Sequence, residues 1–122
     1  MEVGIDILDT ARMEHLTDKK TFLNKFFSQK EIDYIESAPQ SSKAVVMAGY
    51  YSCKEAFLKA CGIGIGRGID LKDICIDYTD LGRPIITLTG KANLKFKELG
   101  YNFITCSISD SNNITVAICI VY

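Results

Sequence analysis

Apolar residues alternate with small or polar ones at the start of the chain, and this period of two predicts a strand over 2–8. Three aliphatic side chains share one face, which we expect to pack on the core: Val3, Ile5 and Ile7. Asp6 then falls on the opposite face, where Gly4 leaves room beside it. Because a carboxylate in the middle of a strand costs stability unless it is paired or bound to a cation, Asp6 is either an edge residue facing water or part of a polar site.

The same alternation predicts four further strands, near 73–78, 84–89, 103–109 and 114–121. Turn-forming residues separate them in pairs, at 80–83 and at 110–113. Helix signals predict a short helix capped by Asp9 or Thr10, helices from Lys20 and from the capping box at Ser28, a long helix over 42–61 ended by Gly62, and a helix near 90–99. We therefore expect one α+β domain spanning 1–122, with a mainly antiparallel sheet packed on one long helix.

The long helix carries three charged residues in a segment that is otherwise apolar: Lys54, Glu55 and Lys59. At about 100° per residue, Glu55 and Lys59 lie side by side on the face opposite the apolar arc around Cys53. Either they form a solvated pair of little energetic weight, or they belong to a site. A second apolar strip borders these charges and predicts a second contact, for which another subunit is the candidate: Met47, Tyr51 and Leu58.

Glycines follow this helix at every second position, with Arg67 among them: Gly62, Gly64, Gly66 and Gly68. The loop is not a dinucleotide-binding fingerprint, because it follows a helix and does not lead into one. A helix carboxyl end repels anions, so a phosphate there must be held by loop amides, Lys59 or Arg67. Asp6 and Glu55 together offer the two carboxylate ligands that Mg²⁺ commonly takes from a protein when phosphates supply the rest.

Composition excludes several other functions. A net charge of −1 with 24% charged residues argues against nucleic-acid binding. The five cysteines lack Cys-x-x-Cys spacing and have apolar neighbours, which predicts reduced core thiols in a cytoplasmic protein. The longest apolar tract, 114–122, is too short for a membrane-spanning helix, and the first residues lack the pattern of a signal peptide. The single histidine, His15, gives no basis for a serine or cysteine triad.

These motifs, in this order, resemble the 4′-phosphopantetheinyl transferases, specifically the small holo-acyl-carrier-protein synthase type. The family's signatures are a Gly-x-Asp near the start, an aromatic residue followed by x-x-Lys-Glu-Ala-x-x-Lys, a glycine loop, a Gly-Lys-Pro hairpin and a closing Ser-x-Ser. The matching segments are Gly4–Asp6, Tyr51–Ala60, Gly62–Gly66, Gly82–Pro84 and Ser107–Ser109. The resemblance covers most of the chain.

The resemblance implies Mg²⁺-dependent transfer of the 4′-phosphopantetheine arm from coenzyme A to a serine of an apo acyl carrier protein, with release of adenosine 3′,5′-bisphosphate. It implies a metal held by Asp6 and Glu55, and coenzyme A held by Lys54, Lys59, Gly64 and Arg67. Glu55, or a water bound beside it, is the candidate base, with Lys59 as the second catalytic residue. Arg12 matches the position that docks the acidic carrier protein.

The chain resembles one half of the larger members of this superfamily, which implies a homotrimer with the site between subunits. It departs from the family in having Tyr50 and Asp110 where an arginine and a histidine suited to coenzyme A phosphates are usual. Two alternatives therefore remain open, a non-catalytic module that binds coenzyme A or a carrier protein, and a structural α+β domain. Transfer of the arm would indicate the enzyme, and binding of coenzyme A without transfer would indicate the module. Binding of neither metal nor coenzyme A would indicate the structural domain.

Overall fold

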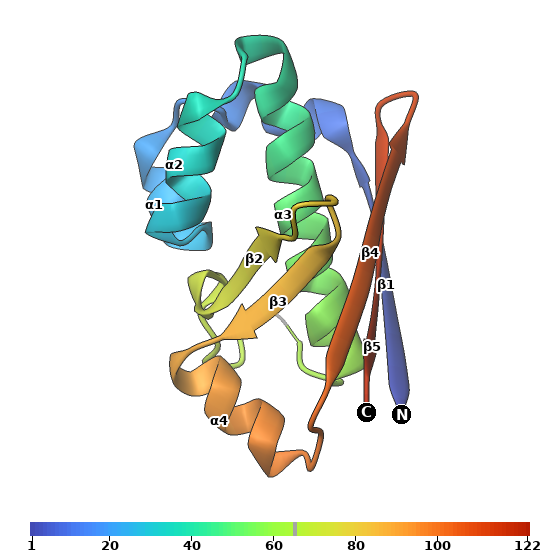
Figure 1. Cartoon of the computed structure of the whole chain (residues 1–122). Helices are drawn as coiled ribbons and strands as arrows, with labels where there is room; N and C mark the ends of the chain where they lie inside the picture. The colour runs from blue at the N-terminus through green and yellow to red at the C-terminus, as the bar shows by residue number, and fades with distance from the viewer. Residues whose placement is uncertain (65) are drawn as a thin grey trace.

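A long helix, α3 (Gln40–Ala60), runs through the middle of the molecule in this computed structural model, which describes residues 1–64 and 66–122 (Figure 1). Ile65, in the glycine loop, lies outside the described residues. The strands are β1 (Glu2–Asp9), β2 (Ile74–Tyr78), β3 (Pro84–Leu88), β4 (Ile104–Ser111) and β5 (Ile114–Val121). The other helices are η1 (Thr10–Leu16), α1 (Lys20–Phe26), α2 (Gln29–Ser37), η2 (Leu71–Asp73) and α4 (Gly90–Glu98), of which η1 and η2 are 3₁₀ helices.

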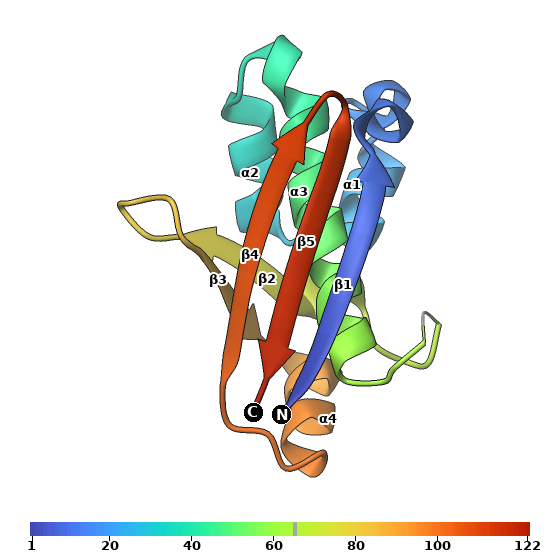
Figure 2. The same cartoon turned by 90° about the vertical axis from the view of Figure 1, so that its right-hand side faces the viewer.

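The strands form two antiparallel sheets, a three-stranded one in the order β1-β5-β4 and a two-stranded hairpin, β2-β3. Helix α3 packs on one face of the three-stranded sheet, and η1, α1 and α2 gather beside its first half (Figure 1). Figure 2 looks onto the opposite face of this sheet, which no described element covers. The expected α+β class with a long central helix is confirmed, with the strands divided between two sheets.

The first strand packs with the opposite face from the one that its sequence predicts. Val3, Ile5 and Ile7 are 60%, 59% and 67% exposed on the uncovered side, whereas Gly4 and Leu8 are buried against α3. The cause is the close approach of the helix: a Cβ at Gly4 would lie 2.0 Å from the carbonyl oxygen of Ala56. Bulky aliphatic side chains therefore cannot face α3 at the level of Gly4.

Strand β5 follows the same arrangement. Its inward positions carry small or medium side chains, all of them buried: Thr115, Ala117, Cys119 and Val121. Its larger aliphatic side chains point outward and continue the surface begun on β1. We call this surface the outer aliphatic face, and it consists of Val3, Ile5, Ile7, Ile114, Val116, Ile118 and Ile120.

Local signals place most helix ends correctly. Ser28 and Glu31 form the predicted reciprocal capping box at the start of α2. At the end of α3, Gly62 has a positive φ of 69°, and the amides of Gly62 and Ile63 bond back to the carbonyls of Lys59 and Leu58. This is the paired hydrogen-bond pattern by which a glycine ends a helix. The long helix begins at Gln40, slightly earlier than predicted.

The last turn is shorter than predicted. Only Asn112 and Asn113, with φ of 50° and 65°, lie between the paired strands. Asp110 and Ser111 continue β4, where they pair with Thr115 and Ile114. Two successive residues of positive φ are what a tight hairpin turn requires, and asparagine adopts that conformation readily. Asp110 is therefore an exposed strand residue and not part of a loop.

Most of the second apolar strip of α3 is buried within the chain itself, so the prediction that it contacts another subunit was wrong for Met47 and Leu58. Met47 and Leu58 are 0% and 3% exposed within the chain's own core. The ring of Tyr51 packs edge-on against Phe26 of α1, with ring centroids 5.8 Å apart. The helices α1, α2 and η1 provide the second contact, because they fold back beside α3.

All five cysteines are free thiols. Cys53, Cys61 and Cys119 are buried, and Cys75 and Cys106 are partly buried, as their apolar neighbours predict. Across residues 1–64 and 66–122, no helix has both the length and the apolar character needed to cross a membrane.

The close contact at Gly4 is testable. Gly4→Ala would place a methyl group 2.0 Å from the Ala56 oxygen and 2.4 Å from the Ala60 nitrogen, so the strand and helix must separate. We expect a loss of about 3 kcal/mol in the free energy of unfolding, measured by urea denaturation at fixed protein concentration. Gly49→Ala is the control, because its Cβ would meet the Ile108 side chain at an ordinary 3.6 Å. Equal stability of the two variants would contradict this packing.

Candidate functional site

A polar cluster lies between β1 and α3, just beyond the close contact at Gly4. The Asp6 carboxylate forms an ion pair with Lys59, with 3.1 Å between Oδ1 and Nζ. Its other oxygen, Oδ2, accepts a hydrogen bond of 2.9 Å from the hydroxyl of Ser52. The Asp6 side chain is only 14% exposed, and Ser52 is fully buried. Of the two possibilities for Asp6, an edge residue facing water or a member of a polar site, the structure shows the second, with an ion pair to Lys59 across the strand and helix.

Glu55 is the remaining carboxylate of the cluster, and one of its oxygens lacks a hydrogen-bond donor among the described residues. It is 7% exposed, and its Oε1 is buried without a hydrogen-bond partner among the described residues. Burial, and then the negative charge of Asp6, raise the pKa of Glu55, while Lys59 opposes them. A buried carboxylate oxygen without a donor is costly, because the lost hydration is not replaced. Glu55 is therefore suited to a ligand that brings a positive charge or a donor.

The two carboxylates fit a divalent metal ion. Asp6 and Glu55 come from adjacent elements, and the negative charge of Asp6 helps to raise the pKa of Glu55. The described residues contain no group of three or more histidine, cysteine, aspartate or glutamate side chains able to hold a metal. A metal at this cluster would therefore take two ligands from the protein and the others from water or a bound phosphate, an arrangement typical of Mg²⁺.

Arg12 and Tyr51 lie at the border of the cluster. Tyr51 is partly buried, and burial followed by the charge of Glu55 raises its pKa, whereas the guanidinium of Arg12 lowers it. Arg12 itself is exposed on η1. It therefore places a positive charge on the surface, near enough to Tyr51 to lower its pKa and accessible to an acidic partner.

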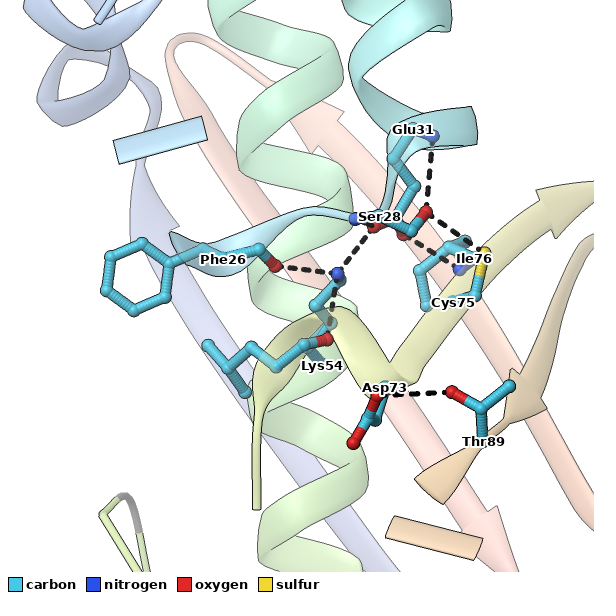
Figure 3. A network of polar contacts seen from close by, with 9 residues as sticks. Phe26, Ser28, Glu31, Lys54, Asp73, Cys75, Ile76 and Thr89 are labelled. Atoms are coloured by element: carbon cyan, nitrogen blue, oxygen red, sulfur yellow. Dashed lines mark hydrogen bonds and ion pairs between the residues drawn. The ribbon is translucent and has the colours of Figure 1, made fainter. Parts of the chain in front are cut away.

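Lys54 lies away from this cluster, in the interior on the other side of α3 (Figure 3). Its Nζ is 2.6 Å from Glu31 Oε1 and donates to the carbonyls of Phe26, at 2.8 Å, and Leu71, at 3.0 Å. An ammonium group has three donors, and all three are used. Both side chains of the ion pair are 0% exposed. Burial lowers the pKa of Lys54, and the charge of Glu31 opposes this.

The expectation that Lys54 contacts a phosphate is therefore not met by its position. Glu31 also accepts hydrogen bonds from the backbone amides of Ser28 and Ile76, each at 2.8 Å. The Lys54–Glu31 pair thus joins α3 to the ends of α1 and α2, to η2 and to β2 (Figure 3). These contacts hold the elements together and use all three donors of the Lys54 ammonium group.

Gly64 and Arg67 line a different hollow, a cavity of about 580 Å³ between the glycine loop and α4. The Arg67 side chain lies over Gly64, 3.8 Å from where its Cβ would be. Lys91 and Lys95 of α4 add two cations to the lining. Of the described residues that line this cavity, none is Asp6, Glu55 or Lys59. The structure brings Gly64 and Arg67 together, but beside the carboxylate cluster and not within it.

Tyr50 is part of the core. It is 2% exposed, and its ring packs against those of Phe27, Tyr34 and Tyr78, with centroids 6.0 to 6.2 Å apart. Burial raises its pKa. The residue that stands in place of the family's usual arginine is therefore a core aromatic.

Sequence reasoning missed the roles of two residues. Ser52 falls on the same helix face as Glu55 and Lys59, so its position was a usable signal, but its bond to Asp6 depends on how the strand lies. Glu31 was recognised only as part of a capping box. Its ion pair with Lys54 joins positions far apart in the chain, and no local pattern indicates such a pair.

Comparisons with known proteins agree with this geometry. Residues 2–119 match the 4′-phosphopantetheinyl transferase superfamily. The chain is 40% identical over 112 residues to the holo-[acyl-carrier-protein] synthase of Syntrophus aciditrophicus, covering 90% of this chain and 86% of that protein. It is 38% identical to the synthase of Clostridium acetobutylicum, covering 94% and 91%. The crystal structure of Helicobacter pylori holo-[acyl-carrier-protein] synthase in complex with coenzyme A superposes with a TM-score of 0.84 at 31% identity, covering 98% and 99%.

The buried ion pair leads to a test of the role of Lys54. Lys54→Met leaves the Glu31 carboxylate without its cation in the interior, so we expect a loss of about 3–5 kcal/mol in the free energy of unfolding. Adding Glu31→Leu should restore a large part of it, since no buried charge then remains. Urea denaturation of both variants measures this. A stable Lys54→Met protein that had lost only coenzyme A binding would show that Lys54 contacts the ligand instead.

Proposed function

Because this chain belongs to the 4′-phosphopantetheinyl transferase superfamily, among the holo-[acyl-carrier-protein] synthases, we propose that it transfers the phosphopantetheine arm of coenzyme A to an apo acyl carrier protein. The acceptor is a serine hydroxyl, and the leaving group is adenosine 3′,5′-bisphosphate. The observation that carries the proposal is the cluster of Asp6, Glu55 and Lys59 at the meeting of β1 and α3, with one buried carboxylate oxygen unpartnered.

In this proposal Asp6 and Glu55 hold a Mg²⁺ ion, which when bound supplies positive charge to the pyrophosphate of coenzyme A. The half-exposed side chain of Lys59 neutralises part of the remaining phosphate charge. The serine oxygen forms a bond to the β-phosphorus, and the bond from that phosphorus to the bisphosphate oxygen breaks. Glu55, or a water hydrogen-bonded to it, takes the serine proton.

Neighbouring residues are assigned to the two substrates. Gly64 and Arg67 line a cavity with Lys91, Lys95 and Glu98. Glu98 pairs with Lys95 at 3.6 Å, and the remaining excess of positive charge suits a phosphate-rich ligand such as coenzyme A. Arg12, exposed on η1 close to Tyr51, is assigned to the acidic carrier protein. The five free thiols fit the proposed cytoplasmic location, where cysteines stay reduced.

We also propose that copies of the chain associate through the outer aliphatic face. Val3, Ile5 and Ile7 are more than half exposed there, next to Ile118 of β5 at 38%. A contiguous apolar surface of this kind is unusual on an isolated chain and typical of a protein contact. A homotrimer, as the family resemblance implies, would bury this face and bring the carboxylate cluster of each subunit close to its neighbour.

The metal assignment predicts that Asp6→Ala and Glu55→Ala each abolish transfer and leave the fold intact. Each variant removes one of only two protein ligands, so the expected loss of kcat/KM is at least about 1000-fold. The measurement is the intact mass of an apo carrier protein after incubation with coenzyme A and Mg²⁺. Circular dichroism checks folding, and Glu2→Ala, which removes an exposed carboxylate at the start of β1, is the matched control. Near-normal Mg²⁺-dependent turnover by either variant would refute the assignment. Coenzyme A binding without turnover in the wild type would select the non-catalytic module.

The assembly surface predicts a change of mass in solution. Ile5→Lys places a charge in the middle of the outer aliphatic face and should convert a cyclic oligomer into single chains, because that charge cannot be buried without a partner. Light scattering at micromolar concentration measures the mass. Leu94→Lys serves as the control, since Leu94 is 62% exposed on α4, outside the outer aliphatic face. An active wild-type monomer would contradict the proposal.

A further inference from the structure

The polar cluster already contains one cation, the ammonium group of Lys59, which is paired with Asp6. The two oxygens of Asp6 are both engaged, Oδ1 by Lys59 at 3.1 Å and Oδ2 by Ser52 at 2.9 Å. No described donor reaches Oε1 of Glu55. The cluster therefore contains two carboxylates and a single ammonium that is committed to one of them, so its negative charge is only half compensated.

The two contacts on Asp6 differ in how easily they can be given up. Ser52 is fully buried in α3, and its hydroxyl also lies 3.4 Å from the carbonyl oxygen of Asp6. Lys59, in contrast, has a side chain that is 55% exposed, and among the described residues it donates, besides Asp6, only to the carbonyl of Ile5, at 3.0 Å. A long flexible side chain at the surface can leave such a pair at small cost. Asp6 would remain in place, held by Ser52, when Lys59 departs.

We propose that Lys59 is a placeholder cation, which occupies Asp6 Oδ1 in the metal-free protein and is released when a divalent cation binds between Asp6 and Glu55. The inference rests on the metal assignment of the proposed function and extends it to the order of events. A carboxylate oxygen that faces an ammonium at 3.1 Å cannot keep that contact and also coordinate a metal ion from the same direction. A metal ion that approaches Oδ1 from this side displaces Lys59, whose 55% exposed side chain has room to move into solvent.

The exchange couples the metal to the phosphate ligand. A divalent ion in place of Lys59 changes the balance of formal charge in the cluster from two negative and one positive to two negative and two positive. The released ammonium then has no anionic partner until a phosphate arrives. When the metal binds alone, the Lys59–Asp6 pair breaks and Lys59 gains no new anionic partner. When metal and pyrophosphate bind together, both the metal and Lys59 are paired with anions. Each ligand should accordingly strengthen the binding of the other.

The test is a titration of the metal-free protein with Mn²⁺, followed by electron paramagnetic resonance, without coenzyme A. Lys59→Met keeps the length of the side chain and removes the competing charge. We expect it to bind Mn²⁺ about two- to fivefold more tightly than the wild type, the factor that corresponds to a partly exposed ion pair. Arg12→Met is the matched control, because Arg12 is a nearby cation for which no contact with Asp6 is found. Arg12→Met should change the Mn²⁺ affinity clearly less than Lys59→Met does.

The outcomes separate the inference from the proposed function. Unchanged or weaker Mn²⁺ binding by Lys59→Met, or an equal gain from Arg12→Met, would overturn the placeholder role. Mn²⁺ affinity retained by Asp6→Ala would instead overturn the metal assignment itself. An independent readout is the ¹³C resonance of each lysine Cε during titration with Mg²⁺. The Lys59 signal should move, while that of Lys54, enclosed by three acceptors, should not. A stationary Lys59 signal at saturating Mg²⁺ would contradict displacement.

Discussion

The distance between β1 and α3 is the constraint on which the rest of the structure depends, and Gly4 sets it. Only a residue without a side chain lets the strand backbone come this close to Ala56 and Ala60. Two residues further along the strand, the same closeness brings the short side chain of Asp6 within reach of Ser52 and Lys59. It also forces the bulky residues of the strand to the other side. One contact thus positions the polar cluster and creates the outer aliphatic face.

The interior ion pair is the second fixed point. Lys54 and Glu55 are consecutive residues of α3, and about 100° of helical rotation sends them to different environments. Lys54 ties the helix to the elements packed behind it, and Glu55 faces β1 and the carboxylate of Asp6. One side of α3 is thus fixed by Lys54, and another side carries Glu55, one of the two candidate metal ligands. Precise placement of two carboxylates requires such support, since a small displacement weakens coordination and catalysis alike.

The sequence was sufficient to predict every strand, most helix ends and the residues of the cluster, because caps, turns and periodicity are local properties. The capping box at Ser28 and the helix end at Gly62 are examples. It failed where the answer depends on distance between elements. Alternation shows that Val3 and Gly4 face opposite ways, but hydrophobicity then selects the wrong face as buried. The sequence also did not indicate the partner of Lys54 or the residues that Met47 contacts, because both depend on how α1 and α2 fold back along α3.

Strand β1 has consequences for inhibition. Its even-numbered residues carry the close helix contact and Asp6, and its odd-numbered residues make up the outer aliphatic face. A small molecule that displaces a neighbouring copy of the chain from the outer face and bends the strand would therefore shift Asp6 relative to Glu55 without entering the polar cluster. Such a compound needs no phosphate-like group, and it would not compete with a charged substrate. Binding to the apolar side of a strand can thus change the position of the charged residues on its other side.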